Sequence, residues 1–150
     1  MRFLGNIEAK ADSKGRVFLP SAFRKVLQAA GEEQLVLRMD VHEKSLVLYP
    51  ESVWAEQMDN LRSRLNRWNR QHQQIFRQFV SEAEAVTLDG NGRFLISRRL
   101  MEAAGIEQAV RFIGVGDTIE IWAVHDDEPF MKKDEFSAAL EEIMNGDGPF

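Results

Sequence analysis

Two short segments of the chain place an arginine four residues after an aspartate, with a glycine directly before the arginine. They are residues 12–16 (DSKGR) and residues 89–93 (DGNGR), 77 positions apart. The guanidinium groups of Arg16 and Arg93 can each donate two hydrogen bonds in a planar fork, which suits a phosphate or the O6 and N7 atoms of guanine. The residue types around them are typical of tight turns. We therefore expect both arginines to project beside loops.

The other residues of these segments have the properties needed to shape the loops. Gly15 and Gly92 can adopt positive φ and allow the backbone to turn tightly and approach a phosphate. Asp12 and Asp89 can accept hydrogen bonds from backbone amides and orient the arginines. A bland alternative is a simple surface ion pair between Asp12 and Arg16, worth less than about 1 kcal/mol. The repetition of the whole pattern favours a functional role.

Further cations lie near the two loops in the sequence. Each of them singly is more typical of a solvated surface, but as a set beside the loops they can hold phosphates. The predicted contacts beyond Arg16 and Arg93 are Lys10, Lys14, Arg24, Lys25, Arg98 and Arg99.

The elements that follow the loops are also repeated. After each arginine come three apolar residues, then a short amphipathic helix that a glycine ends, at Gly31 and Gly105, then two apolar runs rich in β-branched residues. Ser97 is the predicted helix cap in the second copy. Two copies of turn, strand, helix, strand and strand indicate a duplicated domain. Each copy is too small for a secure core, so the two must bury apolar surface against one another.

The segment between the copies is predicted to be helical. Apolar residues recur at spacings of four and three from Trp54 to Phe79, apart from His72. One continuous helix over residues 52–80 would be about 43 Å long and would separate the copies. The weakest helical stretch surrounds Trp68, so we expect a hairpin of two helices. The five arginines of this segment could face solvent, a partner's acids or DNA.

Composition limits the function classes. The 150 residues include 44% hydrophobic and 29% charged residues and no cysteine, which is typical of a soluble protein of a reducing compartment. No apolar run approaches the roughly 20 residues that span a bilayer, and no signal peptide begins the chain. We therefore expect a cytoplasmic protein with no membrane partner.

The net charge of −5 is unevenly distributed. Residues 1–50 and 51–80 each sum to +2, whereas residues 81–150 sum to −9, mostly because of acids after Trp122. A local basic patch near the loops is compatible with this distribution. In the acidic tail, Phe136, Leu140 and Ile143 recur at spacings of four and three, which predicts one amphipathic helix ended by Gly146.

The doubled loops, residues 19–24 (LPSAFR) after the first loop, and residues 114–122 (GVGDTIEIW) at the end of the second copy resemble the MraZ family. This family comprises bacterial transcriptional regulators built from two AbrB-like domains. The resemblance implies an α+β, mainly β fold in which two swapped-hairpin units form an intrachain pseudo-dimeric β-barrel, with a helical hairpin between them and a C-terminal helix. The expected domains are residues 1–50, 51–80, 81–124 and 125–150.

The resemblance also implies a function. It predicts a nucleoid-associated homo-oligomeric ring that binds repeated short sites in double-stranded DNA and represses a division and cell wall gene cluster. Ala11 stands where the family usually has a larger apolar residue, and Ser97 stands where the first copy has Pro20. Both differences affect the expected fine geometry of the loops.

Two other classes of protein have weaker support in the sequence. An antitoxin-like interaction module would use the acidic C-terminal helix to bind a partner protein. An enzyme is disfavoured because no nucleophile elbow, P-loop or dinucleotide fingerprint is present. The three histidines have no ligand spacing, so we expect no metal, no cofactor and no small-molecule substrate.

Overall fold

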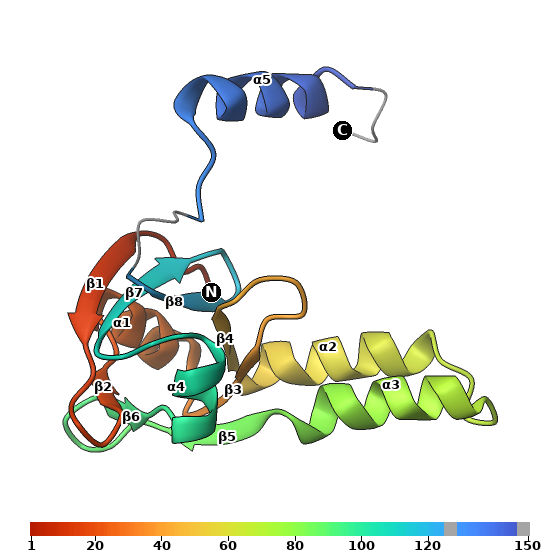
Figure 1. Ribbon diagram of the computed structural model, residues 1–150, viewed down its shortest axis with the longest axis horizontal. Coiled ribbons are helices and arrows are strands. Elements are labelled where there is room, and N and C mark those ends of the chain that lie inside the picture. Colours follow the sequence, from red (N-terminus) through yellow and green to blue (C-terminus); the bar gives the residue numbers. More distant parts are fainter. Residues whose placement is uncertain (125–128, 147–150) are drawn as a thin grey trace.

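A computed structural model describes residues 1–124 and 129–146 of the chain (Figure 1). These residues form an α+β fold with eight strands and five helices. The strands are β1 Asn6–Lys10, β2 Arg16–Phe18, β3 Gln34–Met39, β4 Leu46–Pro50, β5 Glu84–Thr87, β6 Arg93–Leu95, β7 Ala109–Gly114 and β8 Ile119–Ala123. The helices are α1 Ser21–Ala30, α2 Glu51–Ser63, α3 Arg70–Ser81, α4 Arg98–Ala103 and α5 Lys133–Met144.

The short helices of the two copies begin and end where local sequence signals predict. α1 follows Pro20 and ends at Gly31, which has a φ of 68° and donates its N–H to the carbonyl of Gln28. A glycine adopts this left-handed conformation without a Cβ clash. In the second copy the Ser97 hydroxyl accepts the N–H of Leu100 at 3.4 Å and caps α4. The cap predicted at Ser97 is therefore confirmed.

Six strands form one antiparallel sheet in the order β1-β7-β8-β4-β3-β5. The first strand of each copy pairs with a strand of the other copy, since β1 pairs with β7 and β5 pairs with β3. The centre of the sheet also joins the copies through β4 and β8. Neither copy can complete its sheet alone, as expected for two units that share one core.

The predicted intrachain pseudo-dimeric β-barrel is not closed in the described residues. Strands β1 and β5 remain the edges of the six-stranded sheet, and β2 and β6 pair only with each other in a separate two-stranded ribbon. Both ribbon strands have three residues. The strands therefore make an open sheet with a small ribbon beside it.

The core lies between the sheet, the ribbon and the two short helices. The ribbon buries Val17 and Phe94, and the helices bury Phe23 and Leu100. Phe94 meets Phe112 of β7 edge-on, with ring centroids 6.3 Å apart. The core therefore holds the ribbon through the central residue of each strand, Val17 in β2 and Phe94 in β6.

The connection between the copies is the expected helical hairpin, with α2 and α3 side by side in Figure 1. Trp54 at the start of α2 stacks on Phe79 near the end of α3 at 5.2 Å between centroids, so the two helices are antiparallel. The apolar spacing does not form one continuous seam, because Trp68 lies in the turn and is 95% exposed. The turn interrupts the helical spacing of the apolar residues around Trp68, the stretch that the sequence predicts to be the weakest helix.

The C-terminal helix α5 stands clear of the sheet in Figure 1. It contains Phe136, Leu140 and Ile143, as predicted, and it ends at Met144, just before Gly146. Part of the acidic tail, residues 125–128 and 147–150, lies outside the described residues. Among the helices that are described, none is both long and apolar enough to cross a membrane.

Candidate nucleic-acid interface

The β2–β6 ribbon presents one face to solvent. Arg16 lies opposite Leu95, and Phe18 lies opposite Arg93, in the antiparallel register. Since side chains alternate along a strand, the burial of Val17 and Phe94 directs these four residues outward. The exposed fractions are 55% for Phe18 and 51% for Leu95. Two arginines and two apolar side chains therefore share a single small surface, which we call the ribbon face.

The first loop holds Arg16 through a network centred on Asp12. One carboxylate oxygen, Oδ1, accepts the backbone N–H groups of Lys14 at 3.0 Å and Arg16 at 2.9 Å. The other, Oδ2, accepts Nε of Arg16 at 2.8 Å. The carboxylate thus fixes both the turn and the direction of the guanidinium.

The second loop repeats this geometry. Oδ1 of Asp89 accepts the backbone N–H groups of Asn91 at 2.8 Å and Arg93 at 3.0 Å, and Oδ2 accepts Nε of Arg93 at 3.0 Å. Arg93 also lies over the ring of Phe18, with its Cζ 5.8 Å from the ring centroid. The arginine side chains are 41% exposed for Arg16 and 28% for Arg93, so Arg16 is the more accessible.

Hydrogen bonding also fixes the charge of both carboxylates. The backbone N–H of Arg16, with the Arg16 guanidinium and the Lys14 N–H, lowers the pKa of Asp12 below its usual value. The backbone N–H of Arg93 and its neighbours lower the pKa of Asp89 in the same way. Both groups are therefore ionised at neutral pH and hold the Nε–H of their arginines. Across the described part of the chain, no hydrogen bond engages the Nη groups of either arginine.

The two glycines before the arginines allow the copies to approach. Gly15 has a φ of 88° and Gly92 a φ of 84°. The carbonyl of Gly15 accepts the N–H of Ile96 at 2.9 Å, and the carbonyl of Gly92 accepts the N–H of Leu19 at 3.0 Å. A Cβ at Gly15 would overlap the carbonyl oxygen of Ile96. Each loop is consequently locked to the strand of the other copy, and the loops lie at opposite ends of the ribbon.

Comparison with known proteins identifies the family. The family model described as "MraZ protein, putative antitoxin-like" matches residues 2–77 and 79–144. The chain belongs to the MraZ family. A protein of Phocaeicola vulgatus named "Transcriptional regulator MraZ" is 63% identical over 145 residues, which cover 96% of this chain and 94% of that protein.

Two further relatives carry the same name. The protein of Bacteroides thetaiotaomicron is 60% identical over 146 residues, covering 97% of this chain and 94% of the relative. The protein of Christiangramia forsetii is 32% identical over 149 residues, covering 98% and 96%. The similarity therefore spans both copies, the hairpin and most of the tail of this MraZ-family chain.

The remaining predicted cations of the MraZ-family chain are distributed unevenly. Lys14 is exposed in the first loop. Arg24 of α1 donates Nε to the carbonyl of Leu19 at 3.0 Å, and its guanidinium lies against Gly92, 2.5 Å from where a Cβ would stand. A side chain of the first copy thus contributes charge to the second loop.

The structure does not bring all the predicted cations to the loops. Arg99 forms an ion pair with Glu84 at 2.6 Å and donates to the carbonyl of Glu82. Lys10, Lys25 and Arg98 are exposed, and within the described residues no hydrogen bond or ion pair ties them to either loop. Arg99 therefore fastens α4 to β5, whereas the other three side chains are exposed to solvent.

Sequence reasoning missed Phe18 and Leu95 as members of the site. Each lies in an apolar run of the sequence, and strand alternation after a loop arginine places the second following residue on the arginine's own face. The signal was present in the sequence because position 18 and its counterpart, position 95, are both large and apolar. Residues 1–124 and 129–146 contain no cluster of three or more histidines and acids that could hold a metal ion.

Proposed function

We propose that the chain is a transcriptional regulator that binds double-stranded DNA through the ribbon face. The observation that carries this proposal is the arrangement of Arg16 and Arg93, whose Nε atoms are held by carboxylates while no described residue hydrogen-bonds their Nη groups. Such a guanidinium is pre-oriented, so binding costs less side-chain entropy. The names of the relatives are consistent with this role.

The dimensions of the ribbon suit the major groove. That groove is about 12 Å wide and admits a two-stranded β-ribbon, whose strands are about 4.8 Å apart. Arg16 and Arg93 stand at diagonal corners, roughly 7 Å apart along the ribbon at the usual rise per residue. Each Nη pair can donate to O6 and N7 of guanine, and Phe18 or Leu95 can contact a thymine methyl. Lys14 lies beside the ribbon face, where it can reach a phosphate.

Weak single contacts require several copies to act together. One chain offers few cations near the ribbon and carries a net charge of −5. A homo-oligomeric ring would place several ribbon faces on one rim, and tandem short sites would then be bound with avidity. We extend the proposal to this ring, to nucleoid association and to repression of a division and cell wall gene cluster, on the strength of the family resemblance.

Genome-wide footprinting tests the proposal, together with a native mass measurement. We expect enriched tandem repeats, a mass above that of a dimer, and much tighter binding of DNA with three sites than with one. Recovery of no enriched DNA at any salt concentration would overturn the regulator proposal. Equal affinity for one site and three sites would retain DNA binding and reject avidity.

A further inference from the structure

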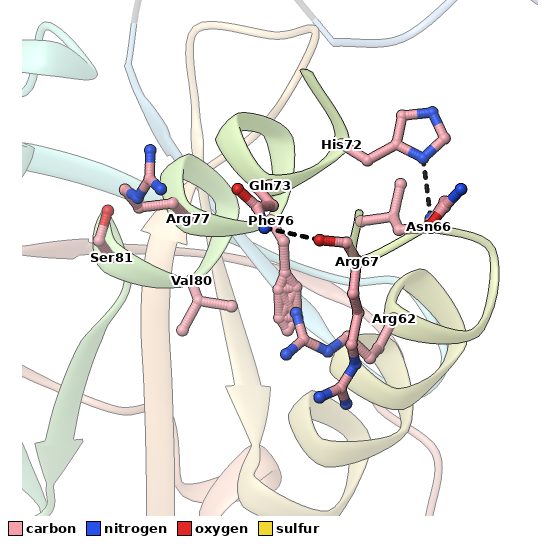
Figure 2. Close-up of a pocket in the computed structure, with 10 residues that line it drawn as sticks. Arg62, Asn66, Arg67, His72, Gln73, Phe76, Arg77, Val80 and Ser81 are labelled. Carbon is pink, nitrogen blue, oxygen red and sulfur yellow. Dashed lines mark hydrogen bonds between the residues drawn. The ribbon is translucent and has the colours of Figure 1, made fainter. Parts of the chain in front are cut away.

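The helical hairpin carries a groove that the DNA-binding proposal does not use. It has a volume of about 660 Å³ and lies along the C-terminal end of α2, the turn and α3 (Figure 2). Residues 62–81 contain five arginines and no acid. The groove lining combines three cationic with three apolar side chains, which are Arg62, Arg67, Arg77, Leu65, Phe76 and Val80. The apolar side chains form what we call the floor of the groove, and the arginines surround it with positive charge.

Local contacts hold the walls of this groove in place. Arg62 stacks on Phe76, with Cζ 4.3 Å from the ring centroid (Figure 2). Gln73 donates Nε2 to the carbonyl of Arg67 at 2.6 Å, and the N–H of Asn66 donates to Nδ1 of His72 at 2.9 Å. These bonds use backbone atoms of the turn, and in the described residues no carboxylate pairs with the guanidinium of Arg67. The cationic rim therefore has capacity for acids from elsewhere.

The helix α5 has the complementary surface. Its large apolar residues Phe136, Leu140 and Ile143 recur at helical spacing and are all exposed. Its acids, Asp134, Glu135, Glu141 and Glu142, fall on the other sides of the helix at 100° per residue. The acids therefore lie on the half of the helix opposite the apolar stripe, and with Lys133 as its one cation α5 carries a net charge of −3. α5 and α3 each have 12 residues, about 18 Å, so their lengths match.

We propose that α5 of one copy of this chain docks in the Arg62–Arg77 groove of a second copy. Phe136, Leu140 and Ile143 would cover the apolar side chains of the groove, and the net negative charge of α5 would lie within the positive field of the groove arginines. The groove on the opposite side of the hairpin fits less well, because Asp40 and Glu82 line it and Glu82 already pairs with Arg38 at 3.6 Å. Charge therefore selects one of the two grooves.

The arrangement within one chain favours a contact between copies. In Figure 1 the hairpin and α5 leave the sheet on different sides, and within the described residues α5 has no extensive contact with another helix or strand. Each copy then has one helix to donate and one groove to fill. Such a head-to-tail contact is heterologous and can close into a ring. The inference does not depend on DNA binding, so either proposal can fail without the other.

Crosslinking in trans provides a direct test, because the chain has no cysteine. We would place Ser81→Cys in the groove of one chain and Ser137→Cys on α5 of another, and treat the mixture with a short bis-maleimide. A two-chain product from the mixture is expected, well above that of a control pair with Ser63→Cys on α2 in place of Ser81→Cys. A double variant that crosslinks internally as a monomer, or a mixture no better than the control, would overturn the proposal.

Charge exchange provides the second test. The variant Arg67→Glu with Arg77→Glu should weaken self-association by about tenfold or more in analytical ultracentrifugation, since attractive contacts become repulsive. Arg70→Glu is the matched control, because Arg70 lies on the same hairpin and does not line the groove. Mixing the double variant with chains carrying Glu141→Arg and Glu142→Arg should restore association. The inference would be contradicted if the double variant self-associated like the parent chain, or if the mixture did not restore association. It would also be contradicted if α5 bound only a foreign protein.

Discussion

Replacing Arg16 by lysine separates base reading from charge in the proposed DNA complex. The loop should persist, because Oδ1 of Asp12 bonds the backbone N–H groups of residues 14 and 16 rather than the guanidinium. Lysine keeps the positive charge but lacks the planar fork of the guanidinium, whose Nη groups form no hydrogen bond with the described residues. The lost bidentate contact is worth about 1–3 kcal/mol, or about 5- to 150-fold in affinity for the operator, per engaged loop.

Fluorescence anisotropy across a salt series measures the contribution of base reading and the contribution of charge to DNA affinity. We expect Arg16→Lys to lose operator affinity by this factor while its affinity for random DNA and its salt slope stay unchanged. Lys14→Ala is the comparison, since loss of a phosphate contact should weaken all sequences alike and reduce the slope by about 0.9 per engaged loop. If Arg16→Lys bound the operator like the parent chain, or lost operator and random DNA equally, Arg16 would not read a base.

Two predictions concern the loops alone. Gly15→Ala and Gly92→Ala should each lower the free energy of unfolding by about 1–3 kcal/mol, because both glycines have positive φ. Gly15→Ala should cause the larger loss of stability. Its Cβ would meet the backbone carbonyl of Ile96, whereas a Cβ at Gly92 would meet the movable side chain of Arg24. Urea unfolding decides this, and equal losses would refute the steric argument. The second prediction concerns the pH dependence of stability. The folded-state pKa of Asp12 is lowered, so the ionised carboxylate stabilises the folded chain fully at pH values above the usual pKa of 3.8. This stabilisation is lost as the pH falls through the lowered folded-state pKa. Carboxylate NMR should give midpoints below 3.8 for Asp12 and Asp89, and in Arg16→Ala the Asp12 midpoint should rise yet remain below 3.8, because the backbone N–H is the largest cause. A midpoint at or above 3.8 in the parent chain would contradict the hydrogen-bond network.

Local features of the fold were predictable from the sequence. Gly31 ends α1, Ser97 caps α4, and the turn near Trp68 divides the helical segment, because each depends on neighbouring residues alone. The loops were predictable for the same reason, since Asp12 and Asp89 bond to backbone groups within four residues.

Long-range pairing was less accessible. An open sheet and a closed barrel need the same alternating strands, and the difference here depends on β2 and β6 pairing with each other rather than with the sheet. Arg99 illustrates the same limit at the site. Its sequence position beside Arg98 indicated a free cation, yet the strand β5 places Glu84 against it. Only the tertiary arrangement decides which cations are engaged in ion pairs and which can contact a partner.

The structure also changes the comparison between the two arginines of the ribbon face. The first loop carries Lys14 where the second has Asn91, so charge alone predicts that Arg16→Ala weakens operator binding more than Arg93→Ala. The greater exposure of Arg16 acts in the same direction, since 41% of its side chain is accessible against 28% for Arg93.

Arg24 acts in the opposite direction, because it belongs to the first copy and lies against Gly92 of the second loop. We therefore expect Arg24→Gln to reduce the contribution of the second loop specifically. In double-mutant cycles on operator DNA, Arg24→Gln should couple with Arg93→Ala, and its effect should simply add to that of Arg16→Ala. Coupling with Arg16 instead would show that Arg24 serves the loop of its own copy. In that case the charge of each copy would remain with its own arginine, and the larger effect of Arg16→Ala would follow from sequence alone.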